Sequence, residues 1–290
     1  MSLKTRIFPE HNYKGIHMNG KTIRIALDPK KEISELLYPE FYDVKVTSYC
    51  KGHCPYCYQD SEEVPHTDDI LTKFRDFFGK FSLNEMPFQI AFGGGEPTSH
   101  PHFVELMKAS YDMDIVPNYT TNGMWVEEGP EKIHEILEVT KNFCGGVAVS
   151  THPHLEKCWR KATDAYLMHN VFTNLHIIIS DKKSIDDFMK IYNEYTGRVK
   201  YFVLLPLSAQ GRAKEAHIDW DYVVEALPQD CHDIAFGANF YPYLQGAQKR
   251  FKVSLYEPES MSGYLDLTDM KVYKSSFSSE EKIIGKGSKI

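Results

Sequence analysis

The sequence predicts an α/β protein built around parallel strands. Two observations support this fold class: short β-rich runs alternate with amphipathic helical stretches, and a helical stretch rather than a tight turn follows each main strand. Such alternation is typical of strand–helix–strand units. No low-complexity segment, internal repeat or obvious linker interrupts it over the 290 residues.

Six runs rich in β-branched and aromatic residues predict the strands of the sheet. They are Tyr42–Thr47, Phe88–Phe92, Ile115–Thr120, Gly146–Ser150, Leu175–Ser180 and Tyr201–Leu207. The third run contains Pro117, which cannot donate to a strand ladder, so the limits of that strand are the hardest to set.

Apolar residues at helical spacing predict helices between these strands. The pattern is clearest in Asp69–Phe81, whose spaced apolar residues are Ile70, Leu71, Phe74, Phe77 and Phe78. Further helices are expected at Glu131–Phe143, Ser184–Tyr195 and Trp220–Leu227. Two His-Pro-His segments, 100–102 and 152–154, predict helix starts rather than pairs of metal ligands, because proline is well tolerated in a first helical turn.

The composition is that of an ordinary globular protein, with 42% hydrophobic and 25% charged residues. The net charge of −7 gives no sign of a protein-wide basic surface for nucleic acid. No apolar run approaches the roughly 20 residues that span a bilayer, and the N-terminus lacks the apolar core of a secretion signal. We therefore expect no nucleic-acid partner and no membrane segment.

Three of the six cysteines are scattered, at Cys144, Cys158 and Cys231. We interpret them as small buried hydrophobic residues rather than as disulfide partners. They predict a reducing, cytoplasmic setting.

The other three cysteines form a C-x3-C-x2-C motif, at Cys50, Cys54 and Cys57. Three thiolates this close together can hold three corners of an iron–sulfur cube and leave the fourth iron open for a ligand. Half of a zinc knuckle is an alternative, with His53 as the one local candidate for a fourth ligand. Three incidental thiols are another.

A glycine-rich turn, Gly93–Pro97, directly follows the second predicted strand. Glycines allow the backbone to approach a ligand closely, and a carboxylate at the mouth of a strand can accept hydrogen bonds from an ammonium group. Taken alone, a triple glycine more usually forms a plain tight turn.

Together these motifs resemble those of the radical S-adenosylmethionine (SAM) enzymes, over roughly residues 40–215. The resemblance implies a partial (β/α)6 TIM-like barrel with an N-terminal extension and a small C-terminal β-rich appendage. It places the barrel at 41–230, an extension with an accessory strand at 1–40, and a β-rich extension with a loose tail at 231–290. The accessory strand is expected within 22–28, and a hairpin turn at 268–270.

The resemblance also implies the cofactors and the residues that hold them. Cys50, Cys54 and Cys57 would bind a [4Fe–4S] cluster, and Glu96 would hold the amino group of SAM. The remaining expected SAM contacts are Tyr56, Gly94, Gly95, Asn122, Ser150, Ile178 and Leu207. For Asn122 a plain Asn-Gly turn is an equal alternative, and for Ile178 a place in the sheet core is compatible with the contact.

His152 departs from the pattern of the family, which often has an aspartate at this position. It is our candidate catalytic residue, as a substrate contact or as an acid or base; capping of the following helix is the alternative. Arg212 lies in a Gly-Arg-Ala segment similar to that of peptide-modifying relatives, although a surface residue at a helix start would look the same.

The reaction implied is reductive cleavage of SAM to a 5′-deoxyadenosyl radical, which abstracts hydrogen from a peptide or small metabolite. An external one-electron reductant of flavodoxin or ferredoxin type is expected. Peptide-maturing relatives often carry a cysteine-rich SPASM extension for auxiliary clusters, and its cysteines are missing here. A non-catalytic metal or iron–sulfur protein, and a peptide maturase with a cryptic auxiliary cluster, remain the alternatives.

Overall fold

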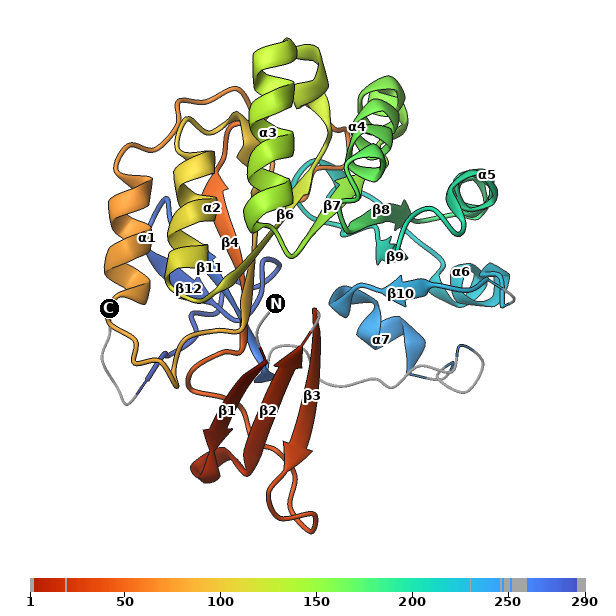
Figure 1. Ribbon diagram of the computed structural model, residues 1–290. Helices are drawn as coiled ribbons and strands as arrows, with labels where there is room; N and C mark the ends of the chain where they lie inside the picture. The colour runs from red at the N-terminus through yellow and green to blue at the C-terminus, as the bar shows by residue number, and fades with distance from the viewer. Residues whose placement is uncertain are drawn as a thin grey trace.

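The computed structural model describes residues 3–18, 20–229, 231–245, 247, 251 and 260–285. Its main element is a nine-stranded sheet with the order β10-β9-β8-β7-β6-β5-β4-β11-β12. Eight neighbouring strands run parallel, and only β12 pairs antiparallel, with β11. The sheet curves as a partial barrel whose two edges, β10 and β12, do not pair with each other (Figure 1).

The six predicted strands are confirmed, with limits that shift by at most two residues. They are β4 (Phe41–Thr47), β5 (Gln89–Gly94), β6 (Val116–Thr121), β7 (Gly146–Ser150), β8 (Thr173–Ile179) and β9 (Tyr201–Pro206). Along β4 the residues alternate: Tyr42, Val44 and Val46 are buried in the core, whereas Asp43 and Lys45 face the barrel interior. Pro117 is accommodated within β6.

Helices cover the outer face of the sheet (Figure 1). The main ones are α1 (Ile70–Phe78), α2 (Phe103–Asp112), α3 (Pro130–Phe143), α4 (Glu156–Met168), α5 (Lys182–Tyr195) and α6 (Trp220–Ala226), followed by the short α7 (Tyr241–Leu244). The starts of α2 and α4 follow the two His-Pro-His segments, as predicted. The extents of α2 and α4 were not foreseen.

Local sequence explains why these helices form. In α1 the apolar positions Ile70, Phe74, Phe77 and Phe78 are fully buried, and Phe78 packs edge-to-face on Tyr42 of β4. Helix α5 begins with a capping box between Asp181 and Ser184.

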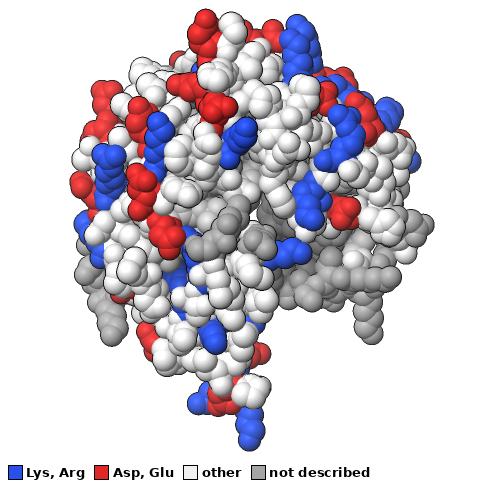
Figure 2. All heavy atoms as spheres, in the orientation of Figure 1, with Lys and Arg blue, Asp and Glu red and all other residues white. Residues whose placement is uncertain are grey.

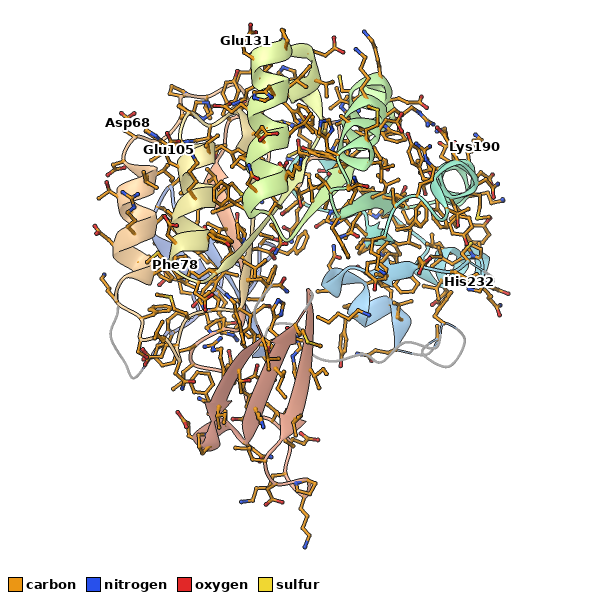
Figure 3. The ribbon with its side chains drawn as sticks, viewed as in Figure 1. Asp68, Phe78, Glu105, Glu131, Lys190 and His232 are labelled. Carbon is orange, nitrogen blue, oxygen red and sulfur yellow. The ribbon has the colours of Figure 1, made fainter. Side chains whose placement is uncertain are left out.

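Polar and charged residues occupy the outward faces of these helices, as Glu105, Glu131 and Lys190 show (Figure 3). Figure 2 shows basic and acidic side chains interspersed over this face of the molecule.

The N-terminal extension forms a separate antiparallel sheet of β1 (Lys4–Phe8), β2 (Tyr13–Met18) and β3 (Lys21–Ala26). The predicted accessory strand is β3, and the other two strands of this sheet were missed. Arg6, which is buried, ties the sheet to the rest of the protein by donating to the carbonyls of Pro39, Tyr38, Asn84 and Glu85.

The C-terminal segment completes the main sheet. Strand β10 (Ile234–Phe236) extends one edge beside β9, and the predicted hairpin is present as β11 (Ser262–Asp266) and β12 (Lys271–Tyr273). Strand β11 pairs with β4, so residues more than 200 positions apart in the sequence line the same part of the barrel. Residues 286–290 of the predicted loose tail lie outside the described residues. None of the described helices is both long and apolar enough to cross a bilayer.

Candidate cofactor and substrate site

The three motif cysteines lie in the loop that follows β4. Cys50 and Cys54 are buried, and Cys57 is partly buried. Backbone N–H groups point at two of the sulfurs: Gly52 N–H donates to Cys50 Sγ at 3.3 Å, and Ser61 N–H donates to Cys57 Sγ at 3.4 Å. Such N–H···S bonds favour the thiolate and tune a cluster bound to it.

Burial makes the free thiols poor acids. It raises the pKa of Cys50 to about 11 and that of Cys54 to about 12. A thiolate in this position therefore needs a positive metal centre to stabilise it. No group of three or more His, Cys, Asp or Glu side chains in the described part of the chain converges on a single ion. A four-iron cube does not require convergence, since each thiolate binds a different iron.

A second segment, Gly211–Arg212, contacts the loop of Cys50, Cys54 and Cys57, which is called the cluster loop from here on. The Arg212 guanidinium donates to Cys54 O at 2.7 Å and to Ser61 O at 3.0 Å, and pairs with Asp60 at 3.1 Å. The Arg212 N–H donates to Cys57 O at 3.0 Å. Gly211 has φ +52, and a Cβ there would overlap the Cys57 carbonyl. Arg212 is thus a loop-positioning residue, not an ordinary surface residue.

The glycine-rich turn after β5 packs directly on the start of the cluster loop. Gly95 N–H donates to Thr47 O at 2.7 Å, and Glu96 N–H donates to Tyr49 O at 2.8 Å. Gly94 has φ +105, and a Cβ on Gly95 would overlap the Tyr49 carbonyl. Only glycine fits both positions, because the two backbones approach each other so closely.

Glu96 is buried at the end of this turn and accepts four hydrogen bonds. Its Oε1 accepts from Thr98 N–H at 3.2 Å, Thr98 Oγ1 at 2.6 Å and Thr121 Oγ1 at 2.9 Å. Its Oε2 accepts only from Asn122 N–H, at 2.8 Å. Burial raises the pKa of Glu96, and these four donors oppose that rise. The described residues give this carboxylate no cationic partner, and Oε2 keeps a lone pair for a further donor.

Asn122 joins the Glu96 network to the cluster loop. Its Nδ2 lies 3.6 Å from Cys50 Sγ, and its Oδ1 accepts from Met124 N–H at 2.9 Å. The second bond belongs to the Asn-Gly turn, in which Gly123 has φ +80. The turn and the contact with the cluster loop are therefore both present.

His152 lies after β7 beside Tyr56. The Tyr56 hydroxyl is 3.2 Å from His152 Nδ1. Burial, with the nearby His154 and His176, lowers the pKa of His152 to about 4, so the ring is neutral at pH 7. His152 makes no side-chain bond to the helix that follows it, so the capping role is not seen. His154 instead bonds Gly52 O in the cluster loop at 2.8 Å.

One cavity of about 350 Å³ lies at the C-terminal ends of the barrel strands. Eleven of the twelve predicted site residues line it: Cys50, Cys54, Tyr56, Cys57, Gly94, Gly95, Glu96, Asn122, Ser150, His152 and Ile178. Leu207 does not. It lines an adjacent cavity of about 460 Å³, which Tyr56, His152 and Ile178 share.

Leu207 lines the adjacent cavity because strand β9 ends one residue sooner than the sequence predicted. β9 stops at Pro206, and Leu207 N–H then donates to Ile179 O at 3.0 Å, on the α5 side. Leu205, two residues earlier, lines the main cavity instead.

Other residues of the cavity were missed from the sequence. Asp43 and His176 project inward from β4 and β8, and Tyr264 and Phe277 come from the C-terminal segment. The alternating pattern of β4 was a signal for Asp43, because a charged residue between buried apolar ones must face the other side of the strand. No local signal placed Tyr264 or Phe277 beside the barrel.

Residues 44–172 match the model of the radical SAM superfamily. This match, over less than half of the chain, makes these residues similar to a radical SAM domain. The superfamily uses a [4Fe–4S] cluster and SAM, and the site has the donors for both. Three thiols share one loop, N–H groups point at two of the sulfurs, and a buried carboxylate with a spare acceptor faces the same cavity.

The chain also has the fold of known structures. SuiB of Streptococcus suis bound to precursor peptide SuiA aligns with a TM-score of 0.61 at 13% identity, over 86% of this chain and 62% of that one. Native anSMEcpe with bound AdoMet gives 0.57 at 15% identity, over 82% and 75%. This chain therefore spans less than two thirds of SuiB. A comparison with curated protein sequences finds no match.

Proposed function

We propose that this protein is a radical SAM enzyme that acts on a peptide. Cys50, Cys54 and Cys57 would hold a [4Fe–4S] cluster, and the Gly94–Glu96 turn would hold SAM. When bound and reduced, these cofactors supply a 5′-deoxyadenosyl radical that abstracts hydrogen from the substrate. The observation that carries the proposal is that the cysteine loop and the Gly-Gly-Glu turn, 36 residues apart in sequence, share one cavity.

The residues of the chain have distinct tasks in this proposal. Glu96 accepts from the SAM ammonium through its free Oε2 lone pair, and Asn122 supports both Glu96 and Cys50. Tyr56, Ser150 and Ile178 line the space for the rest of SAM. His152, held neutral and bonded to Tyr56, offers its second ring nitrogen to a substrate group. The barrel walls keep water away from the reacting atoms.

A peptide is the proposed substrate class because of the neighbours in fold. SuiB is recorded with the precursor peptide SuiA, and anSMEcpe with the Cp18Cys peptide at a TM-score of 0.53. The three remaining cysteines lie apart, after α3, on α4 and after α6, so we propose a single cluster. All six cysteines are free thiols, which supports a reducing, cytoplasmic setting and an electron donor of flavodoxin or ferredoxin type.

The test is the formation of 5′-deoxyadenosine. Protein reconstituted anaerobically with iron and sulfide is reduced with dithionite, incubated with SAM and analysed by mass spectrometry. We expect slow formation by the wild type without substrate and none by the triple variant Cys50→Ala, Cys54→Ala, Cys57→Ala. The matched control is the triple alanine variant of Cys144, Cys158 and Cys231, which should keep the activity. Absence of 5′-deoxyadenosine from iron-loaded wild type would overturn the proposal.

A further inference from the structure

Asp43 lies on the inner face of β4, below the cofactor end of the cavity. In the parallel register it pairs with Tyr264 of β11 on one side and with Ala91 of β5 on the other. Paired residues in neighbouring strands project from the same face of a sheet, so these three form a row across the barrel wall. The Asp43 side chain reaches the open space of the cavity, yet the barrel around it raises its pKa to about 7.

No described residue neutralises this carboxylate. Asp43 makes no hydrogen bond or ion pair with any residue that the structure describes. Lys45, two residues along the same face, is the nearest basic residue in sequence, but its Nζ bonds Asp266 Oδ2 at 2.8 Å. The other oxygen of Asp266 accepts from Thr268, so the Lys45–Asp266 pair is complete without Asp43.

The described lining of the cavity contains acidic side chains but no balancing basic ones. Its described lining contains two carboxylates, Asp43 and Glu96, and neither lysine nor arginine. The two histidines of the lining, His152 and His176, are neutral at pH 7, because burial lowers the pKa of each to about 4. Glu96 already has four donors and a place for the SAM ammonium, whereas Asp43 has none of these. Asp43 is therefore the carboxylate of this lining that lacks a partner among the described residues.

The surroundings of Asp43 suit a cation. The rings of Tyr58 and Phe277 are in contact, tilted by 33° with centroids 4.5 Å apart, and with Tyr264 they form an aromatic wall of the cavity. Aromatic faces attract ammonium and guanidinium groups, and more strongly where water is excluded. Small residues leave room beside the carboxylate: Ala91 is its neighbour on β5, and a Cβ on Gly93 would meet no atom within 4 Å.

The position of Asp43 separates it from the SAM site. Ala91, its partner on β5, precedes Gly94 of the Gly-Gly-Glu turn by three residues, which is roughly 10 Å along a strand. A group bound at Asp43 would thus lie deeper in the barrel than the methionine end of SAM. From there a substrate can extend toward the cofactor.

We propose that Asp43, with Tyr58 and Tyr264, binds a positively charged nitrogen of the substrate, an ammonium or guanidinium group of the kind found on basic side chains. This inference rests on the proposed function and narrows its substrate class to a cationic one. The attraction between the carboxylate and the cation orients the substrate so that a carbon nearer the cofactor faces the radical. Asp43 is a substrate-binding residue in this scheme.

The test uses SAM-loaded, cluster-reconstituted protein and the probe n-butylammonium. Binding is measured by ligand-detected NMR titration, with 1-butanol as the uncharged counterpart of equal length. We compare wild type, Asp43→Asn, and a matched control, Asp164→Asn, which alters an aspartate paired with Arg198 on the outside of α4. Circular dichroism verifies that both variants are folded.

We expect Asp43→Asn to raise the Kd of n-butylammonium about tenfold or more, as loss of a charge-assisted bond predicts, and Asp164→Asn to leave it unchanged. Equal affinity in wild type and Asp43→Asn would overturn the proposal. The proposal would also be overturned if wild type bound n-butylammonium no more tightly than 1-butanol. This comparison needs no variant. Formation of 5′-deoxyadenosine by the same wild-type sample is measured in parallel, and it tests the proposed function independently.

Discussion

Substitution of Glu96 tests how the cofactor end of the cavity is held together. Glu96→Ala removes the acceptor of four hydrogen bonds, two from Thr98 just after β5 and two from Thr121 and Asn122 at the end of β6. The two hydroxyl donors can rotate to other partners, but the backbone N–H groups of Thr98 and Asn122 cannot. A buried donor left without a partner costs about 1–3 kcal/mol, so two of them cost about 2–6 kcal/mol.

The lower end of that range is the better estimate, because the variant no longer has to bury a carboxylate whose pKa is already raised by desolvation. A loss of about 2 kcal/mol lowers the Tm of a protein of this size by roughly 4–8 °C. The Tm of Glu96→Gln should lie between those of wild type and Glu96→Ala. The glutamine carbonyl keeps the three donors of Oε1, but its amide nitrogen faces the Asn122 N–H and cannot accept from it.

The assay is thermal unfolding of metal-free protein, followed by circular dichroism at pH 7. The control is Glu105→Ala, which removes an exposed carboxylate from the outer face of α2 (Figure 3) and should shift Tm little. A Tm for Glu96→Ala within about 1 °C of wild type would refute the network as a source of stability.

Three further predictions concern SAM, the cluster loop and pH. Glu96→Gln should weaken SAM binding about tenfold with the iron content intact, because a charge-assisted bond to the ammonium is lost; equal affinity in equilibrium dialysis would count against that contact. Gly211→Ala should reduce the iron retained after desalting, since its Cβ overlaps Cys57 O. The control, Gly197→Ala, has a similar strain at φ +74 but open space around the Cβ, so it should lower Tm yet keep its iron. For Asp43 the folded protein binds the proton more tightly than the unfolded chain, so the free energy of unfolding of metal-free wild type should fall as pH rises from 3.8 to about 7. Relative to Asp43→Asn this fall should be about 1–2 kcal/mol, less than the full pKa shift implies, because water in the cavity screens the charge. Parallel pH profiles of the two proteins in urea titrations would contradict it.

The sequence predicted the barrel strands well because each is a short run rich in β-branched and aromatic residues, followed by a helical stretch. It also predicted the cluster loop and the Gly94–Glu96 turn, whose chemistry requires particular residues at short spacing. Leu207 lies at a strand end, where one residue more or less turns a side chain to a different cavity, so its contact with SAM stays a prediction.

The residues that sequence reasoning missed depend on long-range pairing. Tyr264 meets Asp43 only because β11 joins the sheet beside β4, and no local pattern encodes that register. Arg212 is a similar case: its three carbonyl and carboxylate contacts lie more than 150 positions away in the chain. The sequence showed that a histidine replaces the family's usual aspartate at position 152. It did not show the hydrogen bond between His152 and Tyr56.

The iron content of two triple cysteine variants tests the central claim most directly. The claim is that Cys50, Cys54 and Cys57 alone hold one four-iron cluster. After anaerobic reconstitution, wild type and the triple alanine variant of Cys144, Cys158 and Cys231 should each bind about four irons per chain, and the triple alanine variant of the loop cysteines almost none. Undiminished iron in the loop variant would contradict the account. A fall by about half in the other variant would reveal a second cluster and restore the auxiliary-cluster maturase as the better interpretation.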